Sequence, residues 1–304
     1  MKTKQIPALL QQRDQPRVQA RFNRIAATYE CADFFAQTSS ERMLERLDYL
    51  KIHPKWILDV GCGTGRDLHL LSAHFNQAKL IGVDFSQNML IQLSSRPGWR
   101  ARLQDYLFKS HSPRYAVAAK AENLPLAPES MDLIWSNLLL PWVEDIPTLF
   151  SDWQNTLSPQ GVVMFSSLGP DSLKELRIAF GEQHANHIHN FYDMHDLGDM
   201  LLHSGFADPV MDVEWVNIQY ENISTLWQDL KACGAVNALP HRPKGLMNRQ
   251  KWQKILDTLH AQQTEKGIQI TLELIQGHAW KGQKQSAKPS ENHITQTLKF
   301  YPKK

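Results

Sequence analysis

Apolar positions along this chain follow two periods, which alternate between residue 40 and about residue 168. Short apolar runs of the kind found in buried strands are separated by segments with the spacing of amphipathic helices. Strands are predicted at 57–60, 79–83, 117–119, 131–136 and 161–167, and helices at 39–50, 67–74 and 146–157. This alternation predicts an α/β fold, a parallel sheet with helices on both faces.

Beyond residue 168 the pattern changes to longer strands and inserted helices. Strands are predicted at 210–220 and 268–280, and helices at 171–180, 196–203, 224–232 and 248–262. Asp171 or Ser172 is the expected N-cap of the first of these helices. We interpret the strands as an antiparallel pair that completes the sheet. The expected organisation is an N-terminal helical lid at 1–50, one α/β domain at 51–281 with a helical cap inserted at about 221–265, and a polar tail at 282–304. Within the tail, residues 294–301 are a candidate edge strand.

Composition and charge narrow the class of protein. The chain has 304 residues, of which 42% are hydrophobic and 21% charged, as is ordinary for a globular protein. A net charge of +2 gives no reason to expect a nucleic-acid partner. Cys31, Cys62 and Cys233 form neither a disulfide framework nor a metal-ligand pair, which suits a reducing cytoplasm. No signal peptide and no membrane-spanning run is recognisable. We therefore expect a cytoplasmic monomer without a membrane or metal site.

The segment 57–65, with the sequence ILDVGCGTG, carries the strongest chemical signal. It reads as a strand, a tight turn and a helix start, the arrangement by which α/β folds bring backbone against a nucleotide. Glycines such as Gly61 and Gly63 permit close approach of a ligand to the main chain. Asp59 stands two residues before the first glycine and would repel a pyrophosphate. A cofactor that bears an ammonium and a sulfonium would be attracted instead.

A second acid supports a nucleoside-containing cofactor. Asp84 ends the second strand, about 20 residues after Gly65, the separation at which a βαβ unit places an acid against ribose hydroxyls. Phe85 and Met89 then offer apolar surface for a flat base. The alternative is an ordinary strand pair whose glycines only ease packing. The acids at both strand ends favour the cofactor site.

Several segments together resemble a known family. Residues 57–65 and 79–84 resemble motifs I and II of the S-adenosylmethionine-dependent methyltransferases. The accompanying segments are VQARFNRIAATY (18–29), AENLP (121–125), SNLLLPW (136–142), GPDSLKELRIAF (169–180), DMHDLGD (193–199) and GHAWK (277–281). Over residues 17–281 the chain is similar to the malonyl-acyl-carrier-protein O-methyltransferases of biotin synthesis. The resemblance implies the class I methyltransferase fold, a Rossmann-like and mostly parallel seven-stranded sheet.

A sister group shares many of the same segments. These are the mitochondrial complex I assembly factors, which keep the methyltransferase fold and hydroxylate an arginine. The segments DMHDLGD and GHAWK favour the biotin branch. An assembly factor or arginine hydroxylase remains the alternative function, and the expected fold is the same for both groups.

The resemblance implies a site for S-adenosyl-L-methionine. Asp59 would face the methionine amino group while Gly61 and Gly63 let the backbone close on the cofactor, and Asp84 would hold the ribose diol. Phe85 and Met89 would flank the adenine, backbone groups of Ala121 and Glu122 would contact it, and Ser136 would line the methionine end. The family commonly has Asp before Ala121, whereas this chain has Lys120. Asp132 reads as a structural residue at the start of its strand.

The same resemblance suggests four substrate-side residues. Tyr29 would belong to a lid over the cofactor and Trp142 would border the transferred methyl, although both could simply pack in the interior. Arg177 and His189 are candidates to bind the malonyl carboxylate, the alternative for Arg177 being a solvated helix face. The family often has Arg where this chain has Asn190. His184, His187 and His189 read as a polar loop rather than a metal site.

The implied reaction requires alignment more than acid–base chemistry. The nucleophile would be the free carboxylate of a malonyl thioester on acyl carrier protein, and such acids are ionised at neutral pH. No Ser/His/Asp or Cys/His constellation is evident. Residues 241–256 contain five basic residues and no acid, namely Arg242, Lys244, Arg249, Lys251 and Lys254. Because acyl carrier proteins are acidic, this cluster is a candidate docking surface, the alternative being an ordinary solvated face.

Overall fold

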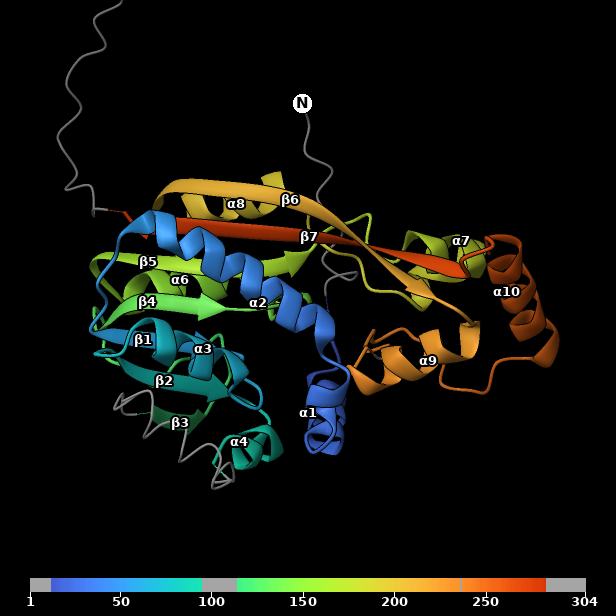
Figure 1. Cartoon of the computed structure of the whole chain (residues 1–304), viewed down its shortest axis with the longest axis horizontal. Helices are drawn as coiled ribbons and strands as arrows, with labels where there is room; N and C mark the ends of the chain where they lie inside the picture. Colours follow the sequence, from blue (N-terminus) through green and yellow to red (C-terminus); the bar gives the residue numbers. More distant parts are fainter. Residues whose placement is uncertain (1–11, 95–113, 236, 283–304) are drawn as a thin grey trace, which may run out of the picture.

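The protein is built on one seven-stranded sheet. The computed structural model describes residues 12–94, 114–235 and 237–282. The strands are β1 Trp56–Val60, β2 Lys79–Asp84, β3 Arg114–Ala118, β4 Met131–Ser136, β5 Leu157–Leu168, β6 Phe206–Tyr220 and β7 Ile268–Lys281. Their order across the sheet is β3-β2-β1-β4-β5-β7-β6. The first five strands are parallel, and β7 runs antiparallel to both β5 and β6. The expected antiparallel pair at the end of the sheet is confirmed (Figure 1).

Helices lie on the two faces of this sheet and at its edges. The α-helices in the described part of the chain are α1 Gln15–Ile25, α2 Phe34–Leu47, α3 Arg66–His74, α4 Gln87–Ser94, α6 Ile146–Thr156, α7 Lys174–Phe180, α8 Met194–His203, α9 Ile223–Ala232 and α10 Arg249–Ala261. Helices α6 and α8 pack on one face of the sheet and α2 and α3 on the other, while further helices lie at its edges. One core contains Trp153 of α6 and Leu201 of α8, and the opposite core contains Met43 of α2 and Leu68 of α3. Successive strand residues point to opposite faces, so the apolar runs of the central strands supply both cores.

Parallel register brings the candidate site to one edge of the sheet. Asp59 in β1 is opposite Gly82 in β2 and Trp135 in β4. The turn after β1, the acid at the end of β2 and the loop after β4 therefore lie together at the carboxyl ends of the strands. Open α/β sheets bind ligands at this edge.

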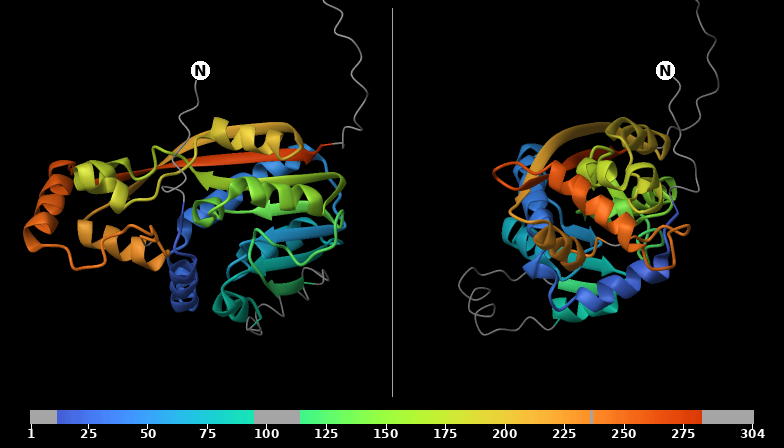
Figure 2. Two further views of the ribbon diagram at one scale, coloured as in Figure 1. Left: turned by 180° about the vertical axis from the view of Figure 1, so that it is seen from behind. Right: turned by 90° about the vertical axis from the view of Figure 1, so that its right-hand side faces the viewer.

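A separate group of helices stands over that edge. The long strands β6 and β7 extend past the rest of the sheet and carry α9 and α10 between them, beside α7 (Figures 1 and 2). Leu226 of α9, Leu259 of α10 and Ile270 of β7 are buried together in a third apolar cluster. We call α7, α9, α10 and their connecting loops the cap.

Some element boundaries differ from the expected ones. Helix α7 begins at Lys174, not at residue 171, and Leu173 before it adopts a left-handed backbone with φ of 60°. Asp171 and Ser172 are not its N-caps, because the Asp171 N–H donates to Glu273 Oε2 and the Ser172 hydroxyl pairs with the backbone of Glu273. Helix α2 begins at Phe34, five residues earlier than expected. The candidate edge strand at 294–301 lies outside the described residues.

Candidate active site

A cavity of about 480 Å³ opens between the carboxyl edge of the sheet and the cap. Its sheet side is lined by most of the residues expected to hold a cofactor, namely Asp59, Gly61, Gly63, Asp84, Phe85, Met89, Ala121 and Glu122. Its cap side is mainly apolar and includes Leu176, Leu226, Trp227 and Ile270. The cavity therefore joins a polar, glycine-lined compartment to an apolar one.

The glycine turn after β1 is held against β2 by its backbone. The Gly61 N–H donates to the Val83 carbonyl at 2.8 Å, and the Gly63 N–H donates to Asp84 Oδ2 at 3.0 Å. Gly63 has a φ of 52°, and a Cβ placed on it would meet nothing within 4 Å. Because Gly63 also lines the cavity, its bare backbone is open to a ligand.

Asp84 is a preoriented hydrogen-bond acceptor. Its Oδ1 accepts from the Ser86 N–H at 2.7 Å and its Oδ2 from Gly63. Burial raises the pKa of Asp84 to about 6, against the lowering effect of these two backbone donors. The carboxylate is fixed in a direction that suits a ligand diol.

Asp59 is a buried carboxylate that lacks a hydrogen-bond donor at one of its oxygens within the described part of the chain. It is 1% exposed, and its Oδ2 has no hydrogen-bond partner among the described residues. Burial raises its pKa well above the usual range, and the charges of Asp67 and Asp84 raise it further. A buried carboxylate of this kind is stabilised by a cationic donor. The residues present thus fit a cofactor that carries an ammonium group beside Asp59.

An aromatic wall runs from the N-terminal helix to the cap. The Phe22 ring lies 6.3 Å from Tyr29, 6.4 Å from Phe85 and 5.3 Å from Trp142, between ring centroids. Trp142 in turn packs edge-on against His189 at 5.5 Å. All five line the cavity. Phe22 had not been singled out in the sequence, although it lies within the segment 18–29 that carries the family resemblance.

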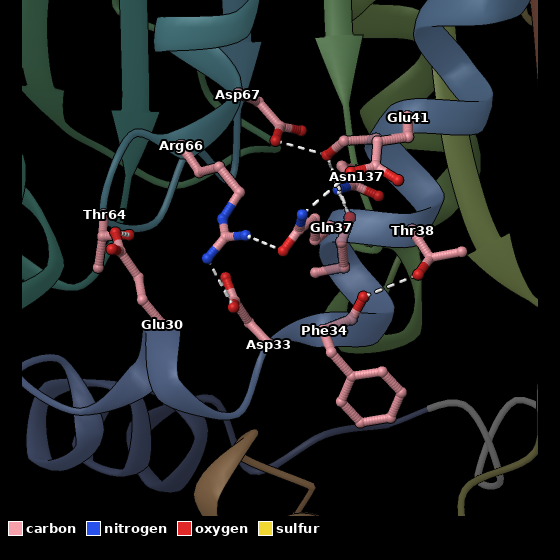
Figure 3. Close-up of polar contacts among 12 residues, drawn as sticks. Glu30, Asp33, Phe34, Gln37, Thr38, Glu41, Thr64, Arg66, Asp67 and Asn137 are labelled. Atoms are coloured by element: carbon pink, nitrogen blue, oxygen red, sulfur yellow. Dashed lines mark hydrogen bonds and ion pairs between the residues drawn. The ribbon is translucent and has the colours of Figure 1, made fainter. Parts of the chain in front are cut away.

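A polar network fastens the start of α2 to the glycine turn and α3 (Figure 3). Arg66 Nη2 donates to Asp33 Oδ1 at 2.7 Å, and Arg66 Nη1 donates to Gln37 at 2.8 Å. The Thr64 hydroxyl donates to Glu30 at 2.5 Å. These contacts connect residues about 30 positions apart in the sequence, so no local pattern predicted them. We call this set the lid network.

Asp67 anchors the same region from inside. It accepts hydrogen bonds from the Ser40 hydroxyl at 2.5 Å and from Trp135 Nε1 at 2.8 Å. Asn137 donates to Ser40 at 2.8 Å and lines the cavity. A buried acid in the first turn of α3 therefore couples α2 to the end of β4.

Comparisons with known proteins agree with this architecture. Residues 58–165 match the family model described as a methyltransferase domain. The malonyl-[acyl-carrier protein] O-methyltransferase of Methylovorus sp. strain MP688 is 40% identical over 91% of this chain and 92% of its own length. The protein of that name from Gallionella capsiferriformans is 39% identical over 88% of this chain and 91% of its own length.

The chain belongs to the malonyl-[acyl-carrier protein] O-methyltransferase family. This membership confirms the family expected from the sequence, its methyltransferase class and S-adenosyl-L-methionine as the cofactor.

Solved structures support the fold. The YcgJ protein of Bacillus subtilis has a TM-score of 0.55 at 15% identity, covering 79% of this chain and 98% of its own. A putative methyltransferase of Bacillus halodurans has a TM-score of 0.54 at 16% identity, covering 79% of this chain and 99% of its own. The expected class I methyltransferase sheet is confirmed.

Two residues expected in this O-methyltransferase site lie outside the cavity lining. Ser136 is fully buried, and its hydroxyl donates to the Val60 carbonyl at 3.0 Å. Arg177 donates from Nη2 to the His189 carbonyl at 2.7 Å and from Nε to the Ser172 carbonyl at 3.3 Å. The structure corrects both expectations, because these side chains are engaged with backbone. Arg177 holds the loop that carries His189.

His189 does line the cavity, as a neutral ring. Its Nε2 accepts a hydrogen bond from the Ala238 N–H at 3.1 Å, so the ring proton resides on Nδ1. Burial, together with the charges of Arg13 and Arg177, lowers the pKa of His189 to about 3. Nδ1 has no partner among the described residues. His189 can therefore offer one neutral donor and no positive charge.

The remaining expectations concern absences and packing. Within the described residues no three His, Cys, Asp or Glu side chains are placed to hold a metal ion, and His187 stacks on Phe180. None of the helices in the described part of the chain has the length and apolar composition needed to cross a membrane. Asp132 is held by hydrogen bonds at the start of β4. It accepts from the Lys55 and Trp56 N–H groups and from the Ser158 hydroxyl, which confirms its structural role.

Proposed function

We propose that this protein transfers a methyl group from S-adenosylmethionine to the free carboxylate of a malonyl group, carried as a thioester on acyl carrier protein, at an early step of biotin synthesis. One observation carries the proposal: the unpartnered, buried carboxylate of Asp59 lies in a cavity that continues beneath the cap. The relatives' shared name supplies the substrate class.

The sheet side of the cavity would hold the cofactor. Asp59 would accept from the amino group, Asp84 would accept from the ribose hydroxyls, and Phe85 and Met89 would flank the base. The backbone beside Ala121 and Glu122 would border the adenine, as their place in the lining allows. When bound, S-adenosylmethionine supplies an electrophilic methyl group on a sulfonium. The lid network would retain it by holding residues 30–40 against the glycine turn.

The acceptor carboxylate requires orientation rather than deprotonation, since a carboxylic acid of this type is ionised at neutral pH. We assign to the Nδ1–H of His189 the role of orienting the acceptor carboxylate. Trp142 and Tyr29 would form the apolar walls around that group. A neutral donor aligns the carboxylate without pairing its charge and so leaves it nucleophilic. Alignment of this kind can contribute roughly 7–11 kcal/mol to the barrier reduction. Charge is neutralised in the step, so exclusion of water by the lid and cap favours it.

The activity is tested directly by mass spectrometry. Incubation of malonyl-acyl-carrier protein with S-adenosylmethionine and the protein should add one methyl group, and acetyl-acyl-carrier protein should remain unchanged. Growth of a biotin auxotroph that lacks this step gives a second readout. If the protein is folded and binds the cofactor but neither methylates the carrier nor rescues growth, the proposal is wrong and an assembly role becomes the better explanation.

The cofactor site has its own test. Gly63→Arg should abolish calorimetric binding of S-adenosylmethionine, because position 63 is open towards the ligand. Gly181→Arg is the matched control, since Gly181 shares the positive φ (56°, against 52° for Gly63) and has free space around its Cβ position but lies outside the cavity lining. Loss of binding in both variants would show that an added arginine disturbs the protein generally.

A further inference from the structure

Helix α1 presents three arginines and no acid. Arg17, Arg21 and Arg24 are spaced by four and three residues, so they share one face of the helix. Arg17 and Arg24 are exposed and Arg21 is partly buried. This arginine face of α1 is a concentrated positive charge on a chain whose net charge is +2.

The arginine face lies at the rim of the cavity. Helix α1 is beside the C-terminal end of α9 (Figure 1), where Arg17 Nε donates to the Asn237 carbonyl at 3.0 Å. The Phe22 ring lies 3.0 Å from the position that a Cβ would occupy on Gly234, so α1 packs closely against the end of α9. Cys233, Ala235 and Asn237, in the segment that follows α9, all line the cavity. The apolar, cap side of the cavity therefore borders α1.

None of the three guanidinium groups has an ion pair within the described residues, and that of Arg17 donates only to the Asn237 carbonyl. Arg21 Nε is buried without a hydrogen-bond acceptor in the described part of the chain. Burial lowers the pKa of Arg21, and the neighbouring charge of Arg24 lowers it further. By contrast, Arg66 is paired with Asp33 and Arg242 with Asp14. The Arg21–Arg24 pair is a site that an anion would stabilise.

The basic cluster expected to dock the carrier is placed less favourably. Its Arg242 forms an ion pair with Asp14 at 2.9 Å, and so is not free. Arg249, Lys251 and Lys254 are exposed on α10, no residue of which lines the cavity. Figure 1 places α10 at the end of the cap distant from α1. Arg21 and Arg24 do not line the cavity themselves, but α1 contributes Gln15 and Phe22 to its lining, so the arginine face adjoins the cavity more closely than α10 does.

We propose that Arg21 and Arg24 bind the phosphate ester of the substrate's pantetheine arm where the arm enters the cap side of the cavity. The inference rests on the proposed function, because a malonyl thioester reaches the cofactor only through such an arm. Arginine suits this role because its planar fork pairs with two phosphate oxygens at once. The apolar cap lining would accommodate the arm beyond the phosphate.

The test compares substrates with and without the phosphate. Arg21→Gln/Arg24→Gln should lower kcat/KM for malonyl-pantetheine 4′-phosphate by about 10- to 100-fold, mostly through KM, the range expected for charge-assisted hydrogen bonds. The kcat/KM of the same variant for malonyl-pantetheine, which lacks the phosphate, should stay within about twofold of wild type. Lys251→Gln/Lys254→Gln is the matched control and should leave both substrates unaffected. An equal loss on both substrates, or no loss on the phosphorylated one, would overturn the proposal.

A binding measurement separates this inference from the proposed function. Calorimetry should detect pantetheine 4′-phosphate on the wild type and not on Arg21→Gln/Arg24→Gln, even if no malonyl thioester is methylated. The arginine pair could instead bind the nucleotide phosphates of coenzyme A. Competition by adenosine 3′,5′-bisphosphate, without competition by pantetheine 4′-phosphate, would overturn the assignment to the arm. Arg21→Lys/Arg24→Lys should restore part of the affinity, since the charge remains but the fork is lost.

Discussion

The Gly63 N–H donates to Asp84 Oδ2 at 3.0 Å, so the acid at the end of β2 is oriented by the turn that follows β1. A second backbone donor, Ser86, holds the other oxygen of the same carboxylate. Two adjacent strands thus present one shared, prearranged acceptor to the cavity. Preorientation of this type reduces the entropy lost when a ligand binds.

The first prediction follows from the burial of Asp84. Its pKa is about 6 in the folded protein, above the usual value near 4, so the folded state keeps a proton that the unfolded state has lost. The free energy of unfolding of the cofactor-free protein should therefore fall as the pH rises from about 4 to about 6, by on the order of 3 kcal/mol. Asp84→Asn should remove this contribution, as measured by urea unfolding across the pH range. Equal pH dependence in wild type and variant would contradict the assignment.

Asp59 should matter for binding and not for folding. Asp59→Asn removes a buried carboxylate whose Oδ2 has no partner, so stability should be unchanged or higher. Affinity for S-adenosylmethionine should fall by about tenfold or more, because a charge-assisted hydrogen bond is lost. Calorimetry and thermal unfolding measure the two effects. Asp132→Asn is the opposite control: its three structural hydrogen bonds predict a loss of about 1–3 kcal/mol in stability with cofactor affinity retained.

The lid network should set how long the cofactor stays bound. Arg66→Met removes the contacts to Asp33 and Gln37, and the side chain of Asp33 is only 4% exposed. We expect faster dissociation of S-adenosylmethionine and a loss of about 1–3 kcal/mol in stability. Stopped-flow displacement measures the rate. Arg42→Met removes only exposed ion pairs and should change either quantity little. An unaltered dissociation rate in Arg66→Met would show that the network is not part of the retention mechanism.

His189 should act as a neutral donor. His189→Phe should lower kcat for methyl transfer by about 10- to 100-fold while cofactor affinity stays near wild type, because the donor to the acceptor carboxylate is lost. Because its pKa is lowered to about 3, His189 should contribute no titration to the rate between about pH 6 and 8. His195→Phe, on an exposed residue outside the cavity lining, is the control. A pH–rate step removed by His189→Phe would contradict the neutral ring.

The sequence by itself determined the sheet and the cofactor side of the cavity. The strand–turn–helix at 57–65 is a local pattern, and Asp84 follows at the next strand end, so their meeting requires only that the two strands be parallel and adjacent. Strand β4 has the limits that its apolar run predicted. Asp132 was rightly interpreted as structural from its place at a strand start.

Tertiary structure decided the substrate side. Arg177 and His189 were both candidates in the sequence, yet Arg177 donates to backbone while His189 lines the cavity. Tertiary structure also decided one position on the cofactor side, where the Ser136 hydroxyl donates to the Val60 carbonyl and the neighbouring Asn137 lines the cavity instead. The Arg66–Asp33 contact and the nearness of α1 to residue 237 join distant segments. A side chain's direction depends on which remote element packs beside it and on which backbone groups that element leaves unpaired, and neither is encoded in local spacing.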